Sequence, residues 1–199
     1  MNRMIRRGLH LVVVAAALLA GVVGARAQCT NTGGGVPVPE TMLAVKTIIS
    51  RGLGGLWGDG NDRFKALKGM FQASTPVDPV TTHNVHITIR KNGDSGPVVF
   101  ATTLPAGSFW TPSGTGGFSY FDPADTFGIR KFFLKDTGSS FYVITRIVGR
   151  GLSLANVPLV SSDTLHLMLE FESGGVGDCF GDDLSSCTYG AASQSCFTF

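Results

Sequence analysis

The chain has 199 residues, of which 15% are charged and 43% are hydrophobic. The first 27 residues contain four arginines and no acid, so the remaining 172 residues carry 12 basic and 14 acidic side chains and a net charge of −2, against +2 for the whole chain. A chain with this charge lacks the excess of basic residues that is typical of a nucleic-acid-binding domain. The length of 172 residues suffices for one domain with a hydrophobic core.

Residues 1–27 have the pattern of a secretion signal. Three arginines precede an apolar run at 11–24, and Ala-Arg-Ala at 25–27 places small residues at the two positions that specify cleavage. The apolar run is shorter than the roughly 20 residues that span a bilayer. We therefore expect cleavage before Gln28 and a protein secreted to the extracellular space or the periplasm, with no remaining membrane span.

Residues 28–40 are rich in glycine and proline and suit a linker. We expect a β domain at 41–174 and a cysteine-rich C-terminal tail at 175–199 that packs on it. The segment 41–50 fits either a short strand or the start of a helix, and its β-branched residues favour the strand. The glycine-rich segment that follows, at 51–62, is expected to be a loop.

Short apolar runs separated by turn signals follow from residue 84 onward. In the first run, Val85, Ile87 and Ile89 alternate with polar residues, as in a half-buried strand. Further runs lie at 97–104, 118–121, 128–135, 141–148 and 165–171. No segment has the periodicity of a long helix. The pattern predicts an all-β antiparallel sandwich, immunoglobulin-like or jelly-roll-like, with its termini tied by a disulfide.

Four cysteines follow the signal, at Cys29, Cys179, Cys187 and Cys196. An even number in a secreted protein predicts two disulfides, for which three connectivities are possible. Because three cysteines lie near the C-terminus, we expect at least one of them to bond to Cys29. Their C-x7-C-x8-C spacing, with no histidine nearby, does not match a zinc site.

The segment Gly93–Pro97 reads GDSGP, close to the GDSGGP around the nucleophilic serine of chymotrypsin-like proteases. Those enzymes place histidine and aspartate in a large region before the serine. Here Ser95 follows soon after the predicted cleavage site, His83 and His86 precede it closely, and the second glycine is missing. We therefore interpret Asn92-Gly93 as the turn of a β-hairpin, with Ser95 exposed beside it.

Two acidic clusters are candidates for a calcium ion. Asp59, Asn61 and Asp62 could supply oxygen ligands, but the spacing of a calcium loop is broken and the closing glutamate is missing. The second cluster comprises Asp178, Asp182 and Asp183. For both clusters a solvated loop is the alternative, and no other cofactor is indicated.

The two tryptophans offer a different kind of site. Trp57 lies in a glycine-rich loop and Trp110 follows LPAGSF. Exposed aromatic rings on a β module can stack on sugar rings, so Trp57 and Trp110 are candidate glycan-binding residues. The alternative for Trp110 is burial between the sheets, where aromatic rings contribute the largest apolar area.

Residues 64–180 resemble a module of secreted bacterial proteins. The resemblance rests on an LPAGxxW segment, a tyrosine and aspartate after it, a GIxKxxLK segment and a later glycine, here Leu104, Pro105, Ala106, Gly107, Trp110, Tyr120, Asp122, Gly128, Ile129, Lys131, Leu134, Lys135 and Gly149. Arg150 and the loop after it match only loosely, and the three-cysteine tail is particular to this chain. The group has no established activity, so the resemblance implies a secreted β module and no catalytic residue.

The sequence favours a secreted, non-catalytic binding or structural module of the bacterial envelope or the extracellular space, with a glycan or an envelope protein as its partner. A glycan-binding module that uses Trp57 and Trp110 is one alternative. A secreted hydrolase is the other, with a site assembled from Asp122 or Asp125 and His86 or His166.

Overall fold

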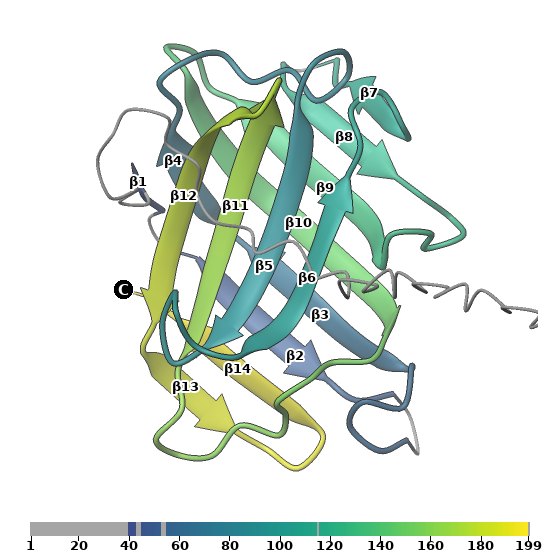
Figure 1. Cartoon of the computed structure of the whole chain (residues 1–199), viewed down its shortest axis with the longest axis vertical. Coiled ribbons are helices and arrows are strands. Elements are labelled where there is room, and N and C mark those ends of the chain that lie inside the picture. The colour runs from purple at the N-terminus through teal and green to yellow at the C-terminus, as the bar shows by residue number, and fades with distance from the viewer. Residues whose placement is uncertain (1–39, 43–44, 53–54, 115, 199) are drawn as a thin grey trace, which may run out of the picture.

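The computed structural model describes residues 40–42, 45–52, 55–114 and 116–198. All fourteen regular elements in these residues are strands, which form two sheets (Figure 1). The described part of the chain has no helix that is long and apolar enough to span a membrane. The predicted signal at 1–27 and almost all of the predicted linker lie outside the described residues.

The first sheet, sheet A, has five strands and lies in front in Figure 1. Its order is β1 (Glu40–Thr41), β12 (Val176–Leu184), β11 (Leu165–Ser173), β5 (Asn84–Lys91) and β6 (Val98–Leu104). The two-residue β1 pairs in parallel with β12, and the other neighbours are antiparallel.

The second sheet, sheet B, has nine strands that run diagonally behind sheet A (Figure 1). Its order is β13 (Ser186–Tyr189), β14 (Ser193–Phe197), β2 (Lys46–Ser50), β3 (Asp62–Leu67), β10 (Phe141–Leu152), β9 (Ile129–Asp136), β8 (Phe118–Phe121) and β7 (Trp110–Pro112). The ninth strand, β4 (Gly69–Gln72), pairs with the start of β10.

The core lies between the two sheets because apolar residues alternate along their strands. Val85, Ile87 and Ile89 are fully buried, as the alternation predicted. Phe71 of sheet B stacks on Phe171 and Phe180 of sheet A, with ring centroids 5.4 and 4.3 Å apart. This contact joins the two layers, and the all-β, two-sheet prediction is confirmed.

The segment expected to be a tail is a structural part of both sheets. Residues 176–184 form β12 in sheet A, and the chain then crosses to sheet B as β13 and β14. Residues 186–197 were not recognised as strands because they contain few large apolar side chains. Strand β2 agrees with the preferred prediction for 41–50, whereas β3 and β4 had no counterpart among the predicted strands.

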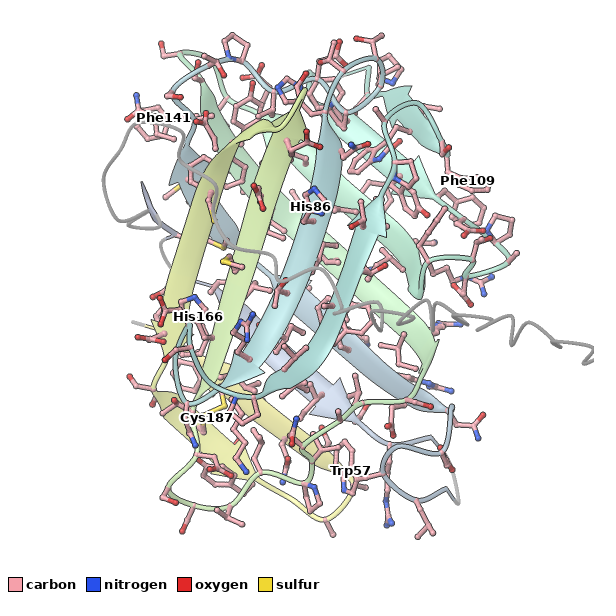
Figure 2. All side chains as sticks on the ribbon, in the orientation of Figure 1. Trp57, His86, Phe109, Phe141, His166 and Cys187 are labelled. Carbon is pink, nitrogen blue, oxygen red and sulfur yellow. A yellow bond between two sulfur atoms is a disulfide. The ribbon has the colours of Figure 1, made fainter. Side chains whose placement is uncertain are left out.

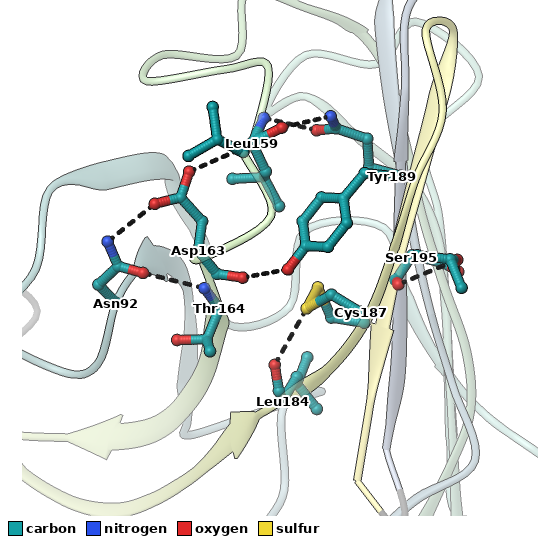
Figure 3. Close-up of a disulfide and its surroundings, with 12 residues drawn as sticks. Asn92, Leu159, Asp163, Thr164, Leu184, Cys187, Tyr189 and Ser195 are labelled. Atoms are coloured by element: carbon teal, nitrogen blue, oxygen red, sulfur yellow. Dashed lines mark hydrogen bonds between the residues drawn. A yellow bond between two sulfur atoms is a disulfide. The ribbon is translucent and has the colours of Figure 1, made fainter.

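Cys187 and Cys196 form a disulfide between paired positions of β13 and β14. Figure 3 shows the surrounding contacts, in which Tyr189 Oη donates a hydrogen bond to the Asp163 carbonyl. The loop before β11 is therefore fixed to this hairpin. Cys179 is also disulfide-bonded, and Cys29 lies outside the described residues, so the predicted bond from a tail cysteine to Cys29 stays a prediction.

The GDSGP segment lies in the loop between β5 and β6. Asn92 and Gly93 both have a positive φ, of 62° and 93°, as a turn at this dipeptide requires. The loop is longer than a two-residue turn, because the Lys91 amide donates its hydrogen bond to the Pro97 carbonyl. Ser95 is exposed, as expected for a loop residue.

Candidate functional site

Polar side chains from three neighbouring strands are linked on the outer face of sheet A. Nδ1 of His86 is 2.8 Å from Oγ1 of Thr103 on β6, and its Nε2 is 3.8 Å from Oε2 of Glu172 on β11. The same Glu172 oxygen accepts a 2.8 Å hydrogen bond from Asn84 Nδ2. Hydrogen bonds from Asn84 and from the Gly175 amide lower the pKa of Glu172, so the carboxylate stays charged beside the imidazole.

The order of hydroxyl, imidazole and carboxylate is also found in hydrolase sites. Acyl transfer also needs amide donors that converge on the developing oxyanion. Thr103 lies within a strand, and strand amides point along the sheet towards neighbouring strands, not out of the face that carries Thr103. We therefore interpret the network as a set of cross-strand contacts that stabilises sheet A.

The second described histidine on this face, His166, pairs with a different acid from those expected. Its Nδ1 is 2.8 Å from Oδ1 of Asp183 on β12. Asp122 instead accepts hydrogen bonds from the Ala124 and Thr126 amides of its own loop. The structure thus brings His86 and His166 to Glu172 and Asp183, and not to Asp122 or Asp125.

Trp110 is a core residue. Its side chain is 4% exposed and packs on Tyr120 and Phe132, with ring centroids 5.2 and 5.4 Å away. Burial and the carboxylates of Asp122 and Asp125 raise the pKa of the neighbouring Tyr120, whose hydroxyl stays protonated. A sugar ring cannot stack on Trp110 in this position.

Trp57 lies far from Trp110. It is half-buried in the loop before β3 and packs against the core. Figure 2 places Trp57 at the lower end of the molecule and Phe109, the neighbour of Trp110, at the side of its upper half. The two tryptophans therefore do not form one binding surface, in contrast to the expectation from the sequence.

In the first predicted calcium cluster, the carboxylate oxygens accept hydrogen bonds that stabilise the loop before β3. Asp59 accepts hydrogen bonds from the amides of Asn61 and Leu56, and these lower its pKa. Asp62 is fully buried and accepts hydrogen bonds from the Gly58 and Leu154 amides. These carboxylates therefore serve as local structural acceptors.

The carboxylates of the second acidic cluster each bind a different partner. Asp178 binds the amide and hydroxyl of Ser74, and Asp182 accepts a hydrogen bond from Thr198 Oγ1. Burial raises the pKa of Asp182, which opposes the charge that a cation would need. No group of three metal-ligating side chains occurs within the described residues.

The outer face of sheet B carries a surface that the sequence did not reveal. Its central row crosses six strands, because the register places Phe121, Lys131, Val148, Lys65, Ile48 and Ser195 side by side. Phe121 is 48% exposed, and Nζ of Lys131 lies 5.4 Å from the centre of its ring. Lysine and aromatic side chains thus share one open face.

The next row adds further aromatic and basic groups. Ser119 lies opposite Phe133, and Phe133 lies opposite Arg146. Farther across the sheet, Lys46 lies opposite Phe197, with its Nζ 5.9 Å from the centre of that ring. Phe133 is 38% exposed, so the face combines accessible rings with cations on neighbouring strands.

Positive charge is concentrated on this face. Eight of the 12 lysines and arginines that follow residue 27 occupy strands of sheet B. Arg130 forms an ion pair with Asp125, and the other seven are Lys46, Arg63, Lys65, Lys131, Lys135, Arg146 and Arg150. The strands of this sheet contain two acids, Asp62 and Asp136, which pair with the core residues Leu152 and Tyr142 and so lie on the inner side. We call the outer face with these seven cations, Phe121 and Phe133 the cationic face.

The cations of the cationic face have no acidic partner among the described ion pairs. The four ion pairs between described residues are formed by other side chains, so no acid of the described residues forms an ion pair with these seven cations. Residues 62–67 carry a sequence signal for β3, because Asp62, Phe64 and Ala66 are buried and alternate with more exposed residues.

No protein-family model matches the chain. The comparisons with curated proteins and with solved structures likewise gave no significant match.

Proposed function

We propose that the protein is a secreted, non-catalytic binding module whose cationic face holds an acidic polysaccharide. The observation that supports this proposal is the segregation of charge, with seven cations and no acid on the outer side of the sheet B strands. A protein whose chain after residue 27 is negative overall thus presents one strongly positive surface. Such a surface attracts polyanions and can discriminate against neutral polymers.

The exposed rings favour a polymer of sugars. A pyranose ring has a face of C–H groups that can cover an aromatic side chain and remove apolar surface from water. Phe121 and Phe133 belong to adjacent rows and strands of the cationic face, so successive sugars could cover both rings. Carboxylate or sulfate groups of the same chain would then lie among Lys131, Arg146 and Lys65.

The disulfide of the β13–β14 hairpin favours an extracellular ligand over nucleic acid. Disulfides persist in oxidising compartments and are rare in the cytosol. The predicted secretion signal indicates the same compartment. Acidic polysaccharides are polyanions available there, and this supports the choice among ligands that share the same charge.

The experiment is a binding panel with the protein lacking residues 1–27. Biolayer interferometry would compare alginate, a polymer of uronic acids, with dextran, single-stranded DNA and vesicles that contain phosphatidylserine. We expect binding to alginate that weakens strongly between about 0.05 M and about 0.5 M salt, and no binding to dextran. Tighter binding to DNA or to vesicles would reject a polysaccharide as the ligand, and no binding to any polyanion would reject the function.

A further inference from the structure

The central row of the cationic face alternates between apolar and charged side chains. From β8 to β2 its residues are Phe121, Lys131, Val148, Lys65 and Ile48. A cation therefore stands on every second strand, on β9 and β3, and an apolar or aromatic residue stands on each strand beside them. This alternation is a property of the strand order, because the five residues come from five separate strands.

The next row shows the same alternation displaced by one strand. Phe133 on β9 lies opposite Arg146 on β10. On the other side of β3, Lys46 of β2 lies between Leu67 and Phe197. Arg146 falls opposite Leu67, because the pairs of β10 with β3 and with β4 on either side of this position share one register. The cations of this row therefore stand on β10 and β2.

The distance between the cations of a row follows from the geometry of a sheet. Two strand spacings separate Lys131 from Lys65 in the central row, and Arg146 from Lys46 in the next row. Two spacings amount to about 10 Å. Val148 is the apolar residue between the first two cations and is 7% exposed, so each row offers two charged contact points on either side of an uncharged step.

Aromatic rings end the two rows at opposite edges. Phe121 ends the central row on β8, with Nζ of Lys131 5.4 Å from the centre of its ring. Phe197 ends the next row on β14, with Nζ of Lys46 5.9 Å from the centre of its ring. These contacts restrict the outer lysine of each row, so less side-chain freedom is lost when an anion binds to it.

An extended acidic polysaccharide has a matching repeat. Successive sugars of such a chain face alternately towards and away from a surface below it, so the surface meets an acid group on every second sugar. Two extended sugars span a length comparable with two strand spacings, and the sugar between two acid groups can cover an apolar side chain with its C–H face. The phosphates of one DNA strand recur about every 3.4 Å, a much shorter repeat.

We propose that the acidic polysaccharide lies across the strands of sheet B, along these two rows, and that the cationic face selects an extended chain with one acid group in every two sugars directed at the protein. Lys131 and Lys65 bind successive acid groups of a chain in the central row, and Arg146 and Lys46 do so in the next row. This inference rests on the proposed function and adds the direction of the ligand and the spacing of its charges.

Exchanging the two residues of a cross-strand pair tests the spacing while the composition and net charge stay the same. Lys65→Ile with Ile48→Lys moves a cation of the central row from β3 to β2, three strand spacings or about 14 Å from Lys131. Phe133→Arg with Arg146→Phe moves a cation of the next row from β10 to β9. In biolayer interferometry, each exchange should weaken binding to alginate about fivefold.

The second exchange guards against loss of the fold, because Phe133 and Arg146 are both exposed. Circular dichroism and urea denaturation should show that each exchanged protein is folded under the conditions of the binding assay. Full affinity of both folded exchanges would overturn the proposal, since binding would then depend on charge without regard to its position. The proposed function would stand in that case, whereas no binding of alginate to the unaltered protein would reject both.

The pair of Arg63 and Ser50 provides the comparison for the direction of the ligand. It is the next outward-facing pair on β3 and β2 and lies outside the two rows. Arg63→Ser with Ser50→Arg should therefore weaken binding to alginate less than about twofold. A loss as large as that of the Lys65 exchange would mean that the ligand runs along β3, which would also overturn the proposal.

Discussion

Phe133 on β9 lies directly opposite Arg146 on β10, and both side chains are exposed on the outer face of sheet B. The pair places an aromatic ring and a guanidinium group on neighbouring strands at the centre of the cationic face. A ligand with an apolar ring face and a nearby anionic group could contact both at once. Substituting each side chain separately should distinguish the contribution of the charge from that of the ring.

Arg146→Gln should weaken binding to alginate about three- to fivefold at low salt, because one cation of the face is lost. Arg90→Gln is the matched control, since it makes the same change in net charge on sheet A, where Arg90 donates a hydrogen bond to the Gly96 carbonyl. Biolayer interferometry of the two variants measures the difference. Equal losses of affinity would mean that net charge, and not the cationic face, determines binding.

Phe133→Ala should reduce affinity for alginate about tenfold, because it removes a ring that a sugar would cover. Because Phe133 is 38% exposed, the loss of its buried part should also lower the free energy of unfolding by about 1–2 kcal/mol. Isothermal titration calorimetry and urea denaturation measure the two effects. Phe141→Ala is the control, with a similarly exposed ring at the start of β10. If the affinity of Phe133→Ala for alginate is unchanged, the Phe133 ring is not part of the binding site.

Trp110→Ala should show the opposite behaviour. The ring fills the core between Tyr120 and Phe132, so its removal should lower the free energy of unfolding by about 3–5 kcal/mol. The affinity of the molecules that remain folded should not change. A stable variant with lost affinity would instead restore Trp110 as a ligand-binding residue.

Acidification should destabilise the protein through Glu172. Its pKa in the folded state is below its ordinary value of 4.5, so its stabilising effect is complete above that value and is lost as the pH falls through the folded-state pKa. Glu172→Gln should therefore be less stable by about 1–2 kcal/mol at neutral pH and should lose less stability than the unaltered protein below about pH 4.5.

Urea denaturation between neutral pH and about pH 3 measures this difference. Asp94→Asn, in the exposed loop between β5 and β6, is the control and should follow the unaltered protein. If the stability of Glu172→Gln falls as steeply with acid as that of the unaltered protein, the hydrogen bonds from Asn84 and Gly175 do not favour the charged form.

The fold class was predictable because it depends on local alternation. Val85, Ile87 and Ile89 show the period of a strand without reference to any other segment, and all three are buried. The last two strands, β13 and β14, show no such pattern, because their stability depends on the sheet they join. Thr188 and Ser195, for example, contact each other across β13 and β14 through their hydroxyls and contribute little to an apolar pattern.

The cationic face was not predictable, because it depends on strand order. Lys65 and Lys131 are 66 positions apart in the sequence but lie in one row, on either side of Val148. The order β2, β3, β10, β9 brings four basic segments together that are separate along the chain. The net charge of the chain gives no indication that the positive charges gather on one face. The separation of the two tryptophans depends on the fold in the same way, because Trp57 lies in the loop before β3 and Trp110 begins β7 at the edge of sheet B.

The most direct test of the proposed function is to map the residues that respond to the ligand. Amide NMR spectra of the ¹⁵N-labelled protein would be recorded during titration with an alginate oligosaccharide and, separately, with an oligosaccharide of dextran. We expect the alginate-dependent shift changes to cluster on β3, β9 and β10 around Lys65, Lys131, Phe133 and Arg146, with none for dextran. Changes that cluster on β5 and β11, or around Trp57, would contradict the assignment of binding to the cationic face.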